Sequence, residues 1–178
     1  ASGTCLASGK KTNNGVIGMD DDSTIVFSIA SQLKQQAWGI GIMTTVTIDH
    51  ATPSAHYAHS ISRNDYYLIG TQLTESDFDF FGGAGFSCPQ NKNQVSDPNL
   101  YDLAEQRGYT LAAGYNDAQN KINCKKLIVV PEKQLSNREQ RASALPYAID
   151  QNEQDLCLSQ IVELSIAHLS NQERFFIM

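Results

Sequence analysis

The sequence predicts an α/β fold with a largely parallel sheet. Segments with helical periodicity alternate with short apolar segments typical of buried strands along the whole chain of 178 residues. A hydrophobic content of 41% with 18% charged residues is typical of a globular chain long enough to bury a core. The sequence contains no internal repeat or low-complexity tract that would suggest a repetitive architecture.

The individual elements follow from periodicity, caps, Gly and Pro. Ile25, Ile29 and Leu33 recur at four-residue spacing behind the capping residues Asp20–Ser23, and residues 131–154 are polar and predict an irregular excursion outside the core. In order, the sequence predicts a helix at 2–8, a helix of about 13 residues after 20–23, a strand at 38–48, helices from 52 and at 64–73, a strand at 78–81, a helix from 98 to 108, strands at 109–112 and 126–130, and a helix at 159–170 that leads into a last strand.

The helix that follows the strand at 38–48 is expected to begin with Thr52 as N-cap and Pro53 at its first position, where a missing N–H costs nothing. This places Thr52 just beyond the carboxyl end of a strand. In open α/β sheets ligands bind at that edge, so we expect the functional site there.

Composition and charge exclude several classes of function. The net charge of −6, with only 13 Lys and Arg spread along the chain, argues against a general nucleic-acid binder, and no apolar run is long enough to span a bilayer. The cysteines form no CxxC motif, which argues against a zinc ribbon or a thioredoxin-like site. Two interpretations remain open for them, buried thiols or pairing in an oxidising compartment, and they concern Cys5, Cys88, Cys124 and Cys157.

Two short motifs suit a metal-assisted phosphate site, Asp49–Pro53 and Ser62–Asn64. His50 and Thr52 offer a neutral nitrogen and a hard oxygen as metal ligands, and Arg63 offers a planar fork of donors that matches two phosphate oxygens. Taken singly, each residue has an ordinary alternative. Thr52 is then a helix cap, His50 a loop histidine and Arg63 a solvated or ion-paired side chain.

Three neighbouring patterns have a structural interpretation that we prefer. His56 and His59 lie three residues apart on a similar helix face, which suits a metal pair but also suits packing. Gly82–Gly85 lacks the Lys and Ser/Thr of a phosphate-binding P-loop and is expected to form a tight turn. Asp20–Asp22 is expected to be a solvated cap.

Several runs, in order, resemble the alkaline phosphatase family, in forms from Bacteroides-type bacteria. They are residues 2–20, Asp49-His50-Ala51-Thr52-Pro53, Ala58-His59, Ser62-Arg63-Asn64, Asp79-Phe80-Phe81-Gly82-Gly83-Ala84-Gly85, Leu145-Pro146-Tyr147-Ala148-Ile149-Asp150 and Phe175-Phe176. The resemblance covers nearly the whole chain. It implies a three-layer αβα sandwich of which residues 1–178 form part of a single domain.

The resemblance also implies a role for three residues. Thr52 matches the hydroxyl ligand of a magnesium site, His50 the variable Asp/His position beside it, and Arg63 the guanidinium that holds the substrate phosphate. The implied reaction is hydrolysis of phosphate monoesters through a phosphoserine intermediate, with two Zn²⁺ ions and one Mg²⁺ ion. The family's serine would precede Ala1 and most zinc ligands would follow the strand that begins at Phe175, so we expect an internal fragment that is inactive alone.

The family further suggests a homodimer in the periplasm or outside the cell, acting on small phosphate monoesters. Two alternatives stay open. One is the sulfatase or phosphodiesterase branch of the same superfamily, in which another nucleophile replaces the serine. The other is a non-catalytic binding or scaffold fragment that uses the fold without its metals.

Overall fold

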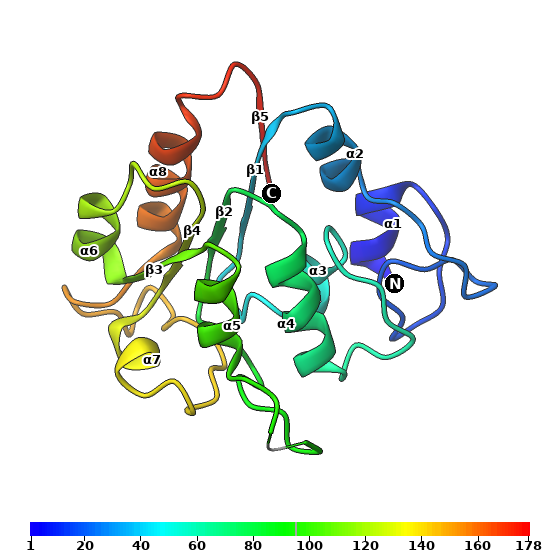
Figure 1. Ribbon diagram of the computed structural model, residues 1–178, viewed down its shortest axis with the longest axis horizontal. Helices are drawn as coiled ribbons and strands as arrows, with labels where there is room; N and C mark the ends of the chain where they lie inside the picture. The colour runs from blue at the N-terminus through cyan, green and yellow to red at the C-terminus, as the bar shows by residue number, and fades with distance from the viewer. Residues whose placement is uncertain (95) are drawn as a thin grey trace.

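A five-stranded parallel sheet lies at the centre of the computed structural model, which describes residues 1–94 and 96–178 (Figure 1). The strands stand in the order β3-β4-β2-β1-β5, and every neighbouring pair is parallel. Their bounds are β1 Gly39–Met43, β2 Phe80–Gly82, β3 Thr110–Ala113, β4 Leu127–Val130 and β5 Phe175–Ile177. All carboxyl ends therefore meet at one edge of the sheet.

Helices cover both faces of this sheet. They are α1 Ser2–Ser8, α2 Ile29–Gln35, α3 Ala51–Ser54, α4 Tyr66–Glu75, α5 Leu100–Gln106, α6 Gly114–Asn120, α7 Glu132–Ser136 and α8 Leu158–Leu169. Figure 1 shows α6 and α8 to one side of the sheet and α1, α2 and α4 to the other. The predicted three-layer αβα arrangement is confirmed.

The strand residues divide between two hydrophobic cores because successive side chains point to opposite faces. Ile40, Phe81 and Ile128 join a cluster with residues of α4 and α5. Phe80 and Leu127 join a second cluster with residues of α6 and α8. A strand that is buried on both faces has apolar residues at successive positions. This is why these strands can be predicted from the sequence.

Glycines on β1 and β2 allow α8 to approach the sheet closely. A Cβ on Gly82 would lie 2.2 Å from Cγ2 of Ile161, and one on Gly41 would lie 2.6 Å from Oγ of Ser165. Both partners are fully buried residues of α8. The absence of side chains at these strand positions thus sets the distance between sheet and helix.

Most predicted elements are confirmed, with ends shifted by a few residues, but two in the first half differ. The second helix begins at Ile29 and not after Asp20–Ser23, because Ser28 caps it by accepting a hydrogen bond from the backbone N–H of Ser31 at 3.0 Å. The residues before it form a turn, in which the Asp20 carboxylate accepts from the backbone N–H of Thr24. The strand predicted at 38–48 ends at Met43.

The start of α3 also corrects the sequence interpretation. The N-cap is His50, whose side chain makes no cap hydrogen bond, so Thr52 lies at the second helical position and Pro53 at the third. Proline is tolerated here as well, because the first N–H groups of a helix have no intrahelical partner. The prediction that Thr52 caps this helix is wrong.

The second half contains two helices that the sequence analysis did not identify, α6 and α7. Residues 131–154 include α7 and an isolated β-bridge from Ala144 to Val46, and the rest is turns and coil. Gln134 and Leu145 within this segment are buried. The cysteines form no disulfide among the described residues, and Cys5 is exposed while the other three are partly exposed. Of the two interpretations left open for the cysteines, burial of the thiols is therefore wrong.

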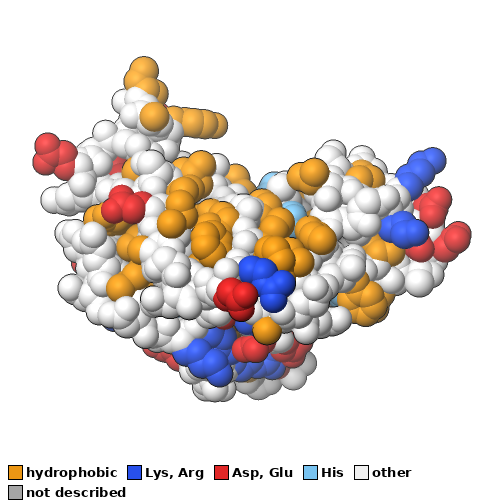
Figure 2. Space-filling view, turned by 90° about the horizontal axis from the view of Figure 1, so that it is seen from above, with side chains coloured by type: hydrophobic (Ala, Val, Ile, Leu, Met, Phe, Trp, Pro, Cys, Tyr) orange, Lys and Arg blue, Asp and Glu red, His pale blue; other side chains and the backbone are white. Residues whose placement is uncertain are grey.

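Several large hydrophobic side chains are exposed on the described part of the chain. Among residues 1–94 and 96–178, no helix combines the length and apolar character that a bilayer span needs. Hydrophobic side chains gather across the middle of the upper face (Figure 2). At the sheet edge, Phe175 of β5 is 39% exposed.

The close contact of α8 with β2 predicts that Gly82→Ala destabilises the protein. The added methyl group meets a buried, branched side chain, and such overpacking costs about 1–3 kcal/mol of unfolding free energy. Urea unfolding measures the loss. Gly39→Ala is the matched control, because its Cβ would first meet Cγ of the exposed and flexible Gln172, so a smaller loss is expected. Equal stability of Gly82→Ala and the unmodified protein would contradict this packing.

Candidate functional site

The segment that leaves β1 folds back along the carboxyl edge of the sheet. The backbone N–H of Ala84 donates to the carbonyl of Val46 at 2.9 Å, and that of Ile48 donates to the carbonyl of Gly85 at 3.0 Å. Residues 44–48 thus run beside the loop that follows β2. The pairing delivers Asp49 and the following residues to the edge where α/β sheets bind ligands.

Asp49 fixes the end of this segment. Both carboxylate oxygens accept the backbone N–H of Ser87, at 2.8 and 3.0 Å, and the side chain is fully buried. Burial raises the pKa of Asp49 to about 6, although the hydroxyls of Thr47 and Ser87 and the Ser87 N–H lower it. The sequence analysis gave Asp49 no separate role, and its position directly after a buried apolar run was the available signal.

His50 and Arg63 meet, as the phosphate-site interpretation requires. Nη2 of Arg63 lies 3.1 Å from Nε2 of His50. Since a guanidinium can only donate, Nε2 accepts and the ring proton belongs on Nδ1. Burial, and then the charge of Arg63, lower the pKa of His50, which keeps the ring neutral. Nδ1 of His50 is itself buried and has no partner among the described residues.

Thr52 lies two residues beyond His50 and is exposed, and its hydroxyl makes no hydrogen bond within the described part of the chain. Helix α1 packs against it closely. A Cβ on Gly3 would lie 3.3 Å from Cα of Thr52 and from the carbonyl oxygen of Ala51. The start of α1, Thr52 and the His50–Arg63 pair therefore belong to one corner of the molecule.

The backbone of Arg63 is held from a distant part of the sequence. Its N–H donates to the carbonyl of Gly15 at 2.7 Å, while the neighbouring Ser60 exchanges two backbone hydrogen bonds with Ile17. The guanidinium is exposed, so the donors that do not contact His50 remain accessible to a ligand.

His56 and His59 have packing roles, as preferred from the sequence. Nδ1 of His56 contacts the carbonyl of Thr52 at 3.3 Å, and Nδ1 of His59 contacts the carbonyl of Gly18 at 2.7 Å. Within residues 1–94 and 96–178, no group of three or more His, Cys, Asp or Glu side chains is placed to hold a metal ion. The corner can therefore supply only part of a metal site.

The buried Asp49 predicts an unusual pH dependence of stability. Its pKa rises from 3.8 to about 6 on folding, so the folded protein keeps a proton that the unfolded chain has lost in this range. The favourable contribution is complete below pH 3.8 and falls by about 3 kcal/mol as the pH rises to about 6. Asp49→Asn removes this decline. Urea unfolding across the range in EDTA should show the variant gaining relative to the unmodified protein, and parallel pH profiles would contradict the assignment.

Sequence comparison connects this corner with one family. A family model described as alkaline phosphatase matches residues 1–77, which include His50, Thr52 and Arg63. Alkaline phosphatase 4 of Bacillus subtilis is 29% identical over 184 residues, an alignment that covers 100% of this chain and 37% of the relative. The chain thus spans well under half of that relative's length.

Solved structures show the same relationship. Alkaline phosphatase from the Antarctic bacterium TAB5 superposes with a TM-score of 0.80 at 28% identity, covering 99% of this chain and 48% of that one. A histidine-to-glutamate mutant of the TAB5 enzyme, with Mg bound in the M3 site, gives a TM-score of 0.81 at 27% identity over the same shares of the two chains. In sequence along its length and in the arrangement of its sheet, this chain is similar to these alkaline phosphatases.

Proposed function

We propose that this protein hydrolyses phosphate monoesters and that Arg63 binds the phosphoryl group. The observation that supports this most directly is the contact of Arg63 with neutral His50 beside the exposed Thr52, at the carboxyl edge of the sheet. A guanidinium has five donors in a fixed fork, and His50 occupies one nitrogen. The remaining donors are free to bind two phosphate oxygens and to stabilise their charge in the transition state.

The neutral imidazole suits this role because it orients Arg63 without cancelling its charge. A carboxylate at the same place would form an ion pair with the guanidinium and compete with the phosphate. Since Nε2 of His50 contacts Arg63, we assign His50 as a positioning residue rather than an inner ligand of Mg²⁺, which prefers oxygen. Its unpartnered Nδ1 is available to a water or to a ligand from elsewhere in the protein.

Thr52 fits part of a magnesium site. Its hydroxyl is exposed and without a partner among the described residues, and it lies against the start of α1, near where the family resemblance expects the nucleophilic serine. A single hydroxyl does not hold Mg²⁺ alone. By the family resemblance, carboxylates beyond β5 would complete the set, and the two Zn²⁺ ions would bind outside the described residues. When bound, these ions supply charge stabilisation at the attacking and leaving oxygens.

The course through a phosphoserine is part of the same proposal. It rests on the family resemblance and on the placement of α1 against Thr52. Homodimerisation and a periplasmic or secreted location stay predictions from that resemblance.

The function is tested with the protein expressed from its complete gene. p-Nitrophenyl phosphate should be hydrolysed, and EDTA should abolish turnover. Bis(p-nitrophenyl) phosphate and p-nitrophenyl sulfate should be hydrolysed far more slowly. Preferred turnover of either of these would favour the phosphodiesterase or the sulfatase alternative. No turnover of any of the three, with Zn²⁺ and Mg²⁺ present, would favour a non-catalytic domain.

Arg63 should be required for this activity. Arg63→Ala removes every donor to the phosphoryl group and is expected to lower kcat/KM about 100-fold or more. Arg63→Lys keeps the charge but loses the bidentate geometry, so a loss of about tenfold is expected. Steady-state kinetics measure both losses. Arg107→Lys is the matched control, because Arg107 pairs with Glu75 away from the site, and a similar loss in that variant would contradict the assignment.

His50→Asp should strengthen Mg²⁺ binding. The substitution exchanges a nitrogen for carboxylate oxygens beside Thr52, and Mg²⁺ prefers oxygen ligands. Titration of the EDTA-treated protein with Mg²⁺, followed by calorimetry, should show a tighter site, while KM for the phosphate rises because the new carboxylate pairs with Arg63. His168→Asn, on α8 and in contact with the carbonyl of Ile122 away from this corner, is the control. Unchanged Mg²⁺ affinity in His50→Asp would place the ion elsewhere.

A further inference from the structure

A large hollow among the described residues lies away from the His50–Arg63 corner. Its volume is about 830 Å³, within the range of small-molecule sites, and neither His50, Thr52 nor Arg63 lines it. It opens where three strands end, since Ala84 follows β2, Ala113 closes β3 and Pro131 follows β4. It therefore occupies the other half of the carboxyl edge, a place where α/β sheets bind ligands.

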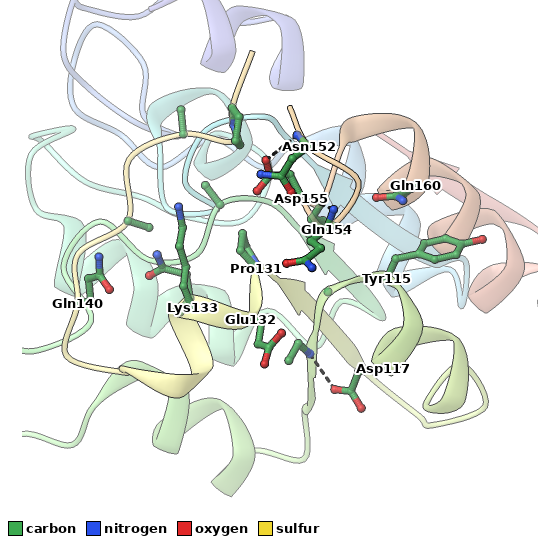
Figure 3. Close-up of a pocket in the computed structure, with 18 of the residues that line it drawn as sticks. Tyr115, Asp117, Pro131, Glu132, Lys133, Gln140, Asn152, Gln154, Asp155 and Gln160 are labelled. Carbon is green, nitrogen blue, oxygen red and sulfur yellow. Dashed lines mark hydrogen bonds between the residues drawn. The ribbon is translucent and has the colours of Figure 1, made fainter. Parts of the chain in front are cut away.

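Polar side chains from four separate segments converge on this hollow. They come from the start of α6, from α7, from the coil after it and from the turn before α8. Figure 3 shows Lys133 and Gln140 on one side, Asn152, Gln154 and Asp155 across from them, and Tyr115 and Gln160 beyond. Convergence of this kind gives the hollow several directed hydrogen-bonding groups.

Several of these groups have no partner within the described part of the chain. The Glu132 carboxylate, the Lys133 ammonium and the side-chain amide of Gln154 are exposed and take part in no hydrogen bond or ion pair there. Gln134 also lines the hollow and is only 2% exposed, yet its carbonyl oxygen has no donor. A buried acceptor without a donor is unfavourable, and a donor group of a ligand would satisfy it.

The charged side chains that line the hollow are of both signs, so they exclude a simple anion or cation as its ligand. Glu132, Glu153 and Asp155 oppose an anion, whereas Lys133 and Arg141 oppose a cation. No trio of metal-binding side chains occurs among residues 1–94 and 96–178. The mainly polar lining likewise does not suit an apolar ligand.

With simple ions and apolar ligands excluded, the ligand class that remains is an uncharged polyol. Amides, carboxylates and an ammonium offer donors and acceptors side by side, and a hydroxyl can both donate and accept. The ring of Tyr115 adds an apolar surface, and its hydroxyl is held by the Glu163 carboxylate at 2.7 Å. We propose that this hollow binds an uncharged polyhydroxylated ligand, a sugar ring, through Glu132, Lys133, Gln134 and Gln154.

Saturation-transfer NMR with the methyl glycosides of glucose, galactose, mannose and N-acetylglucosamine tests the proposal on the protein expressed from its complete gene. At least one probe should bind, and an excess of sodium sulfate should not displace it. Glu132→Ala and Gln154→Ala should each weaken binding about tenfold, the loss expected for one strong hydrogen bond. Both side chains are exposed, so folding should survive, and thermal unfolding checks this.

Lys92→Ala is the matched control, because Lys92 lies in a different, smaller hollow beside α4 and should leave sugar binding unchanged. The proposal is overturned if none of the four glycosides binds, if sulfate displaces the bound probe, or if Glu132→Ala and Gln154→Ala bind as the unmodified protein does. The readout is independent of phosphatase activity, so failure here leaves the function proposed for Arg63 untouched.

Discussion

Every other feature of this molecule depends on covering a parallel sheet on both faces. Parallel strands expose two apolar surfaces, so each face needs its own layer of helices. The alternation along β4, with Leu127 and Val129 in one core and Ile128 and Val130 in the other, shows how four residues serve both layers. Once both faces are closed, the carboxyl edge is where loops from all strands collect, and both candidate sites lie there.

At that edge, the buried carboxylate of Asp49 fixes the loops that follow β1 and β2 relative to each other. Asp49 holds the backbone of Ser87, and Ser87 in turn accepts the Nε–H of Arg141 at its carbonyl, at 2.7 Å. Burying a carboxylate without an ion pair is unfavourable, as its raised pKa shows. The hydrogen bonds offset this cost locally, and they fix the turn that presents His50. A corner held this firmly keeps Arg63 oriented even though the guanidinium is exposed.

The sequence predicted what depends on local pattern and missed what depends on contacts. The strand at 126–130 and the helix α8 could be predicted without tertiary contacts, because the first is a continuous apolar run and the second has an apolar face. The start of α2 was misplaced because Ser28 competes with Asp20–Ser23 as a cap, and only the fold selects between them. Helix α6 was missed because Gly114–Asn120 lacks an apolar stripe. The candidate residues His50, Thr52 and Arg63 came from a family pattern, whereas the role of Asp49 required the position of Ser87, 38 residues away.

The pairing of Arg63 with an imidazole carries a functional consequence of its own. A guanidinium paired with a carboxylate must give up part of that interaction when a phosphate arrives, whereas one that donates to a neutral ring keeps its full charge for the ligand. The lowered pKa of His50 keeps the ring neutral, and the charge of Arg63 contributes to that lowering. His50 thus stays a neutral hydrogen-bond acceptor and Arg63 stays a cation without a counter-charge. Both are the states that phosphate binding would need. Under the proposed function, Arg63 is oriented and fully charged for the phosphate before any metal ion binds.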